Sequence, residues 1–97
     1  MEIVFAFDKE HNKDHFLVNH PNVSEDEILE VFANKYAVIK EKNKKNFFRL
    51  IGYTHTKKFL VIVGVYGKNK EIFRVITAYP ANKKHLILYK EEVIKHE

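Results

Sequence analysis

The sequence predicts a small α+β domain in which helices pack against one antiparallel sheet. The chain has 97 residues, of which 45% are hydrophobic, enough for a single domain over residues 1–97 with its own core. Apolar residues recur at helical spacing near both ends, whereas the middle holds β-branched and aromatic runs separated by charged turns. We therefore expect a short N-terminal strand, two helices, a four-stranded antiparallel meander and a C-terminal helix.

The first part of the chain is predicted to form the short strand and the two helices. Residues 2–7 are rich in β-branched and aromatic side chains, and Asp8 is a typical N-cap for a helix over residues 8–19. Pro21 ends this helix, because proline disfavours a helical conformation in the residue before it. Ser24 and Glu27 have the spacing of a capping box, which predicts that the second helix begins at Ser24.

The second part is predicted to form the meander and the last helix. Strands are expected over residues 36–39, 47–54, 59–66 and 71–79, with connections at 40–46, 57–58 and 67–70. Strict alternation in the last strand would place Arg74 and Ala78 on one face and Thr77 and Tyr79 on the other. Pro80 ends this strand and is suited to begin the closing helix.

Composition excludes several functional classes. The sequence has no cysteine, which excludes disulfides, thiolate metal sites and thiol catalysis. The N-terminus does not resemble a signal peptide, and the longest apolar run, residues 59–66, is far shorter than the roughly 20 residues that span a bilayer. We expect a soluble cytoplasmic protein with no membrane partner.

Charge is unevenly distributed along the chain. Residues 1–39 hold three lysines and eight acidic residues (net −5), whereas residues 40–97 hold fourteen basic and five acidic residues (net +9). A basic surface favours a polyanionic partner such as RNA, because each neutralised phosphate releases counterions. The alternative, given equal weight, is that the lysines serve only to keep the protein soluble and bind no polyanion.

Histidines are frequent, with six in the chain and three of them between His11 and His20. His11 and His15 have a spacing that can chelate zinc on a helix, but the companion residues of known zinc motifs are missing, so the sequence predicts no metal site and no cofactor. His15 and His20 are candidates for general acid–base catalysis near neutral pH. His20 could equally be an ordinary residue at a helix C-terminus, where the macrodipole favours it.

Two arginines stand inside apolar strands. Arg49 and Arg74 each need a partner or solvent there, but a guanidinium also binds phosphate in a bidentate manner and stays charged. Thr77 and Tyr79 lie at the end of the last strand, just before the closing helix. A phosphate or a base could be held at this corner, although threonine and tyrosine are also ordinary strand residues.

An ordered series of short segments resembles the BrnT-like toxins and the wider RelE, EndoU and colicin type of small ribonuclease fold. The series is residues 5–8 (Phe-Ala-Phe-Asp), 20–24 (His-Pro-Asn-Val-Ser), 48–52 (Phe-Arg-Leu-Ile-Gly) and 73–81 (Phe-Arg-Val-Ile-Thr-Ala-Tyr-Pro-Ala). The resemblance implies a RelE-like fold and a metal-independent endoribonuclease, the toxin of a type II toxin–antitoxin pair. It also implies a cognate antitoxin protein, through which any DNA binding would occur.

Position by position, the resemblance assigns functional roles to four residues. His20 matches the histidine that ends the first helix, Arg49 the arginine before the strand glycine, Arg74 the arginine that opens the last-strand motif, and Thr77 the hydroxyl position. Two positions differ from the BrnT pattern. Tyr79 stands where a second arginine is usual, and His85 stands where an acidic residue is usual.

The residues and the resemblance together give one site hypothesis. RNA cleavage without metal needs a base for the 2′-hydroxyl proton, a cation for the phosphorane charge and an acid for the leaving oxygen. The expected catalytic residues are His15 or His20 for proton transfer, Arg49 and Arg74 for charge, Thr77 for positioning and Tyr79 for base stacking. Weak contacts to the RNA backbone are expected from Lys57, Lys58, Lys83 and Lys84.

Two other functional classes stay open at this point. The first is a non-catalytic RNA-binding or protein-interaction module of the same fold, because fold alone does not determine function. The second is a metal-dependent hydrolase, which ranks last because acidic residues are scarce in the basic half of the chain.

Overall fold

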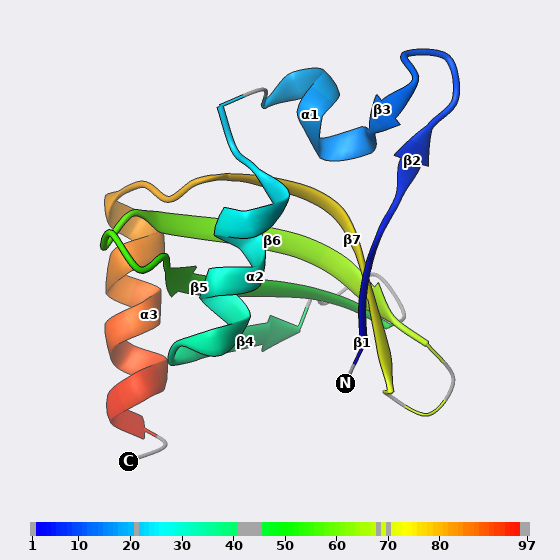
Figure 1. Cartoon of the computed structure of the whole chain (residues 1–97). Coiled ribbons are helices and arrows are strands. Elements are labelled where there is room, and N and C mark those ends of the chain that lie inside the picture. Colours follow the sequence, from blue (N-terminus) through cyan, green and yellow to red (C-terminus); the bar gives the residue numbers. More distant parts are fainter. Residues whose placement is uncertain (1, 21, 41–45, 68, 70, 96–97) are drawn as a thin grey trace.

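The computed structural model describes residues 2–20, 22–40, 46–67, 69 and 71–95. Its elements are β1 (Glu2–Phe5), β2 (Phe7–Asp8), β3 (Lys13–Asp14), α1 (His15–Asn19), α2 (Glu25–Ala33), β4 (Tyr36–Lys40), β5 (Phe47–Tyr53), β6 (Phe59–Tyr66), β7 (Ile72–Pro80) and α3 (Lys83–Lys95). The fold is α+β, as predicted, with helices on a single large sheet (Figure 1).

The large sheet has five strands in the order β1-β7-β6-β5-β4. Strands β4 to β7 form the predicted antiparallel meander, since each pairs with the next along the chain. Strand β1 adds a fifth strand, which pairs parallel to β7 from Glu2↔Ile72 to Phe5↔Val75. The sheet is therefore mixed, and β1 and β7, which are far apart in the sequence, are neighbours in space.

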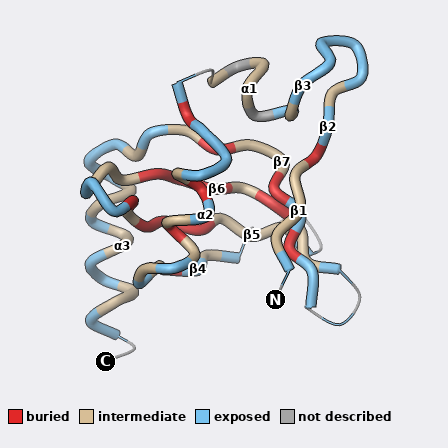
Figure 2. The backbone as a smooth tube through the Cα atoms, in the orientation of Figure 1, coloured by how far each residue is buried: buried red, intermediate tan, exposed pale blue. Residues whose placement is uncertain are grey.

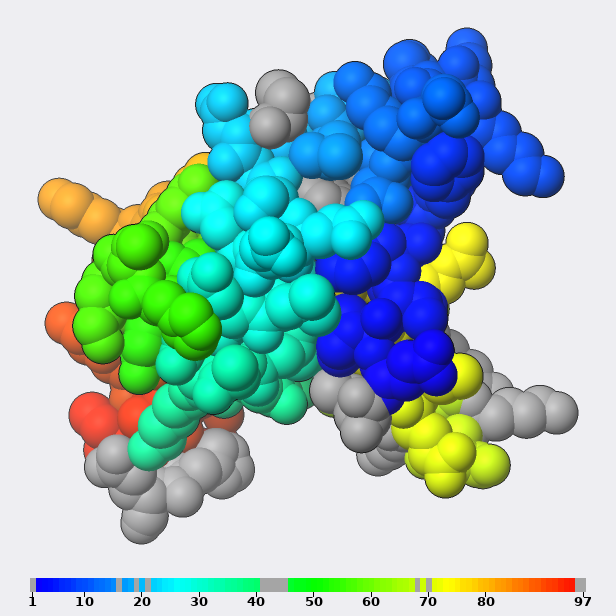
Figure 3. All heavy atoms as spheres, in the orientation of Figure 1, coloured from blue at the N-terminus to red at the C-terminus, as the bar shows by residue number. Residues whose placement is uncertain are grey.

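The core lies between α2 and one face of the sheet. Buried side chains there come from both layers: Val23, Ile28, Val31, Leu50, Leu60, Ile62, Phe73, Val75 and Ala78. In Figure 2 the buried stretches follow the central strands and the inner side of α2. In Figure 3 the N-terminal segment (dark blue) lies beside α2 (cyan) on the side of the molecule in view.

The start of α2 confirms the predicted capping box. The Ser24 hydroxyl accepts a hydrogen bond from the Glu27 amide (3.1 Å), and the Glu27 carboxylate accepts one from the Ser24 amide (3.1 Å). These bonds satisfy two backbone donors that have no partner within the helix. They fix the position at which the chain enters the core layer.

The first predicted helix is wrong over most of its length. Residues 7–14 form the small antiparallel hairpin of β2 and β3, and α1 covers only His15–Asn19. The Asp8 side chain caps a turn instead of a helix, accepting a hydrogen bond from the His11 amide (3.1 Å), and Asn12 has a positive φ of 53°. The segment Lys9–Asp14 has no apolar side chain that could hold a helix against the core.

The predicted alternation of faces in β7 is also wrong. A β-bulge at Val63/Gly64 shifts the register, so that Val63 pairs with Thr77 whereas Val65 pairs with Arg74. Because paired residues share a face, Arg74 and Thr77 lie on the same side of the sheet. A Cβ at Gly64 would come within 2.3 Å of the Arg74 carbonyl oxygen, which explains the glycine at the bulge.

The remaining boundaries differ little from the predictions. Pro80 ends β7, and α3 begins three residues later, at Lys83. Pro21, most of the predicted 40–46 loop and part of the 67–70 turn lie outside the described residues. Within the part of the chain that the structure describes, no helix has the length and apolar character needed to cross a membrane.

Glu25, in the first turn of α2, makes stability depend on pH. A hydrogen bond with Asp14, followed by burial and the nearby acidic charges, raises the pKa of Glu25 to about 7 from its usual 4.5. Since the folded pKa lies above the unfolded value, this contribution to stability is present below about pH 4.5 and is lost as the pH rises through 7.

We therefore expect Glu25→Gln to flatten the decline in stability between pH 5 and pH 8. Urea unfolding at both pH values measures the effect, with the exposed Glu91→Gln as the control. An unchanged pH dependence in Glu25→Gln would contradict this role of the carboxyl group.

Candidate active site

The candidate site lies on the face of the sheet opposite α2. Helix α3 covers the β4–β5 side of this face, where the Tyr89 ring packs against Tyr53 and Phe59 and the Tyr89 hydroxyl donates to the Lys35 carbonyl oxygen (3.0 Å). Towards β7, Val63, Thr77 and Tyr79 are only half-buried. A partly accessible strip therefore runs along β7 and the adjoining Val63, whereas Val61, which pairs with Tyr79, is buried.

Strand register arranges the predicted site residues in neighbouring rows across this strip. Arg49, Val63 and Thr77 form one row, because Val63 pairs with both other residues. Tyr79 lies in the next row on one side and Arg74 in the next row on the other. Rows on one face are about 7 Å apart, so the guanidinium groups and the hydroxyl groups share one surface.

Two imidazole rings flank Tyr79. The ring centroid of His20 lies 5.6 Å from that of Tyr79, and the ring centroid of His85 lies 5.9 Å from it. His20 follows α1, which packs along β7 beyond the end of β1. His85 lies in the first turn of α3. Three separate elements therefore place His20, Tyr79 and His85 together.

His85 has a defined hydrogen-bonding role. Its Nδ1 accepts a hydrogen bond from the Asn82 amide (3.1 Å), while the Asn82 side chain accepts one from the His85 amide (3.1 Å). This is a capping box with histidine in place of glutamate. Burial, and then the charge of Arg49, lower the pKa of His85. A neutral ring with Nδ1 as acceptor carries its proton on Nε2 and is a hydrogen-bond donor.

His85 was named from the resemblance only as a position that differs from the family pattern, and it was not among the predicted catalytic residues. The available signal was the spacing of Asn82 and His85, which matches Ncap and N3 of a capping box. Its proximity to Tyr79 and Arg49, by contrast, depends on how α3 packs against the sheet.

Other predicted residues lie elsewhere or at the margin of this surface. His15 lies next to Asp8, with 3.8 Å between its Nδ1 and the Asp8 Oδ2, at the N-terminal end of α1. Lys58 forms an ion pair with Glu27 of α2 (3.2 Å), on the core side of the sheet. Lys57 lies over the Tyr53 ring (4.6 Å). Lys83 and Lys84 are exposed in the first turn of α3, directly before His85.

No family model matches the chain, no curated protein matches it, and no solved structure matches it.

Proposed function

We propose that this chain is a metal-independent endoribonuclease and the toxin of a type II toxin–antitoxin system. The observation that supports this best is the convergence on one accessible face of Arg49, Thr77 and Tyr79 with the imidazoles of His20 and His85. These groups are the kinds of side chain that RNA cleavage without metal requires.

In the proposed reaction, His20 takes the proton of the 2′-hydroxyl group as the 2′ oxygen attacks phosphorus. The 5′ oxygen leaves with a proton from water, and the products are a 2′,3′-cyclic phosphate and a 5′-hydroxyl end. Arg49 stabilises the charge that develops on the phosphorane, because a guanidinium stays protonated and binds two oxygens at once. Arg74, one row beyond Thr77, binds a neighbouring phosphate.

His85 acts as a neutral donor in this mechanism rather than as a base. With Nδ1 occupied by the Asn82 amide, the Nε2–H group donates to a phosphate oxygen. Thr77 contributes a second hydrogen bond, and the Tyr79 ring stacks on a base.

The positive charge of the lysines beside the candidate site is suited to an RNA substrate. Lys83 and Lys84 next to His85 attract the backbone without reading sequence. A cytoplasmic location would place the protein with its substrate, and a cognate antitoxin that covers the strip would block access to RNA.

The test is cleavage of a short RNA by purified protein in the presence of a chelator, with the cyclic phosphate detected by mass spectrometry. We expect wild type to cleave and Arg49→Ala to lose at least about 100-fold in rate, the magnitude typical of removing one group that stabilises charge in the transition state. Lys95→Ala, at the far end of α3, is the matched control and should cleave as wild type does. Absence of cleavage by folded wild type would contradict the proposal.

The second candidate function is RNA binding without catalysis. The features that favour it are the stacking surface of Tyr79 and the exposed lysines of α3, which suffice for binding. It predicts that wild type retains RNA on a gel while leaving it intact, and that expression in a bacterial host does not arrest growth.

A further inference from the structure

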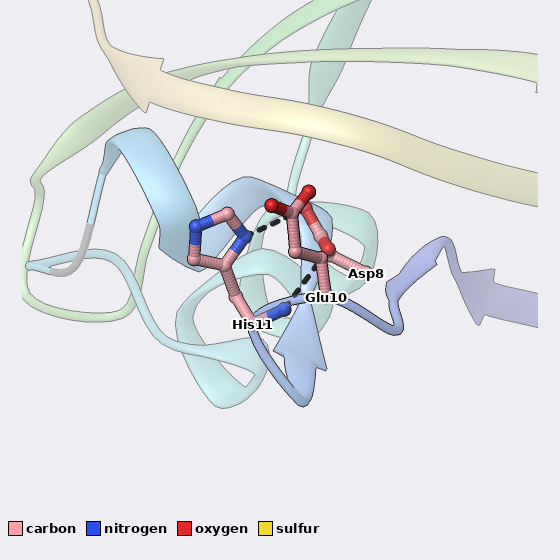
Figure 4. A group of neighbouring side chains, drawn as sticks. All are labelled: Asp8, Glu10 and His11. Carbon is pink, nitrogen blue, oxygen red and sulfur yellow. Dashed lines mark hydrogen bonds and ion pairs between the residues drawn. The ribbon is translucent and has the colours of Figure 1, made fainter.

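A second group of chemically reactive side chains lies apart from the sheet-face site. Asp8 belongs to β2, Glu10 and His11 belong to the turn between β2 and β3, and His15 is the first residue of α1. Figure 4 shows Asp8, Glu10 and His11 gathered around one point, with the His11 ring turned towards the Asp8 carboxylate. The proposed RNA cleavage uses none of these four residues.

The separations within the group approach those between ligands of one small cation, and only the Asp8–His11 separation already equals them. Ligand atoms of Asp8, Glu10 and His11 all lie within 4.8 Å of one another. The Asp8 Oδ2 lies 3.2 Å from His11 Nδ1 and 3.8 Å from His15 Nδ1. In a tetrahedral zinc site with bonds of about 2.0–2.1 Å, neighbouring ligand atoms are about 3.3 Å apart.

The arrangement also orients the ligands without enclosing them. The other carboxylate oxygen of Asp8 accepts a hydrogen bond from the His11 amide (3.1 Å), which leaves Oδ2 facing the two imidazoles. The Asp8 side chain is 18% exposed, whereas those of His11 and His15 are 48% and 46% exposed. A cation could therefore enter from solvent towards an already positioned carboxylate.

We propose that Asp8, Glu10, His11 and His15 bind one zinc ion. Two imidazole nitrogens with carboxylate oxygens are the donor set of zinc, whereas magnesium and calcium prefer oxygen ligands alone. The site is structural: it joins a hairpin of two-residue strands to the start of α1, elements too short to be stable by themselves. It does not depend on the proposed function, and RNA cleavage remains independent of metal.

The test is isothermal titration of untagged, chelator-treated protein with zinc chloride at pH 7.5. We expect one zinc ion per chain in wild type. His11→Gln and His15→Gln should each weaken binding at least about tenfold, because each removes one ligand. His55→Gln is the matched control, since His55 is exposed and lies in the β5–β6 turn, where its Nδ1 contacts Asn34.

A second measurement on wild type keeps the proposal testable if a variant fails to fold. In NMR spectra of the histidine rings, zinc should shift the His11 and His15 signals together and leave the His55 and His85 signals unchanged. Absence of zinc binding in wild type would overturn the proposal. Binding that His11→Gln and His15→Gln leave intact, or zinc shifts confined to other histidines, would also overturn it.

Discussion

Replacing His20 with alanine should lower the rate of RNA cleavage by about 10²- to 10⁴-fold, the usual contribution of a positioned acid–base group. Two imidazoles flank Tyr79, but Nδ1 of His85 already accepts the Asn82 amide, so proton transfer falls to His20. Single-turnover cleavage of a short RNA measures the effect.

Other histidine variants separate this role from a structural one. His85→Gln keeps a side-chain donor and should retain more activity than His20→Ala. His55 is exposed and lies outside the site, so His55→Ala should cleave RNA at the wild-type rate. If folded His20→Ala cleaves as fast as wild type, His20 is not the acid–base residue.

Gly64→Ala should be the most destabilising of the substitutions considered, lowering the free energy of unfolding by about 3 kcal/mol, at the upper end of overpacking effects. The added Cβ would lie 2.3 Å from the Arg74 carbonyl oxygen and 2.6 Å from two atoms of the Phe73 ring. The oxygen belongs to the backbone and the ring is fully buried, so neither can move without disturbing the sheet or the core. Urea unfolding monitored by circular dichroism measures the change.

Gly67→Ala provides the matched control in the same strand–turn region. There the nearest atoms to an added Cβ lie at 3.5 Å, an ordinary contact, and the described glycines have no positive φ. Its unfolding free energy should stay within about 1 kcal/mol of wild type. A Gly64→Ala protein as stable as Gly67→Ala would show that the bulge does not need glycine.

The sequence correctly predicted those parts of the fold that depend on residues close together in the chain. The capping box at Ser24 is formed by residues three positions apart, and it is present as expected. The meander strands were also recognisable, because β-branched and aromatic runs alternate with charged turns. The α+β class and most of the strand boundaries follow from these patterns.

The parts that were missed depend on contacts between distant residues. The bulge opposite Gly64 places one extra residue in β7, so the alternation of faces changes at that point. Simple alternation along the strand therefore assigned Arg74 and Thr77 to opposite faces, although they share one. No local sequence pattern in either strand indicates that β1 pairs parallel to β7. His85 was left out of the predicted catalytic residues for the same reason, since its proximity to Tyr79 arises from the packing of α3.

The parallel pairing of β1 with β7 also determines when the molecule can finish folding during synthesis. Glu2 pairs with Ile72, so the first strand of the sheet must wait until the last strand has been synthesised. Contacts between such distant residues form slowly, because a long loop must close first. Ala6, which follows β1, forms hydrogen bonds to Val75 of β7 and to His15 at the start of α1, and His20 follows α1. The candidate site of a nascent chain therefore stays incomplete until Tyr79 and His85 have been synthesised.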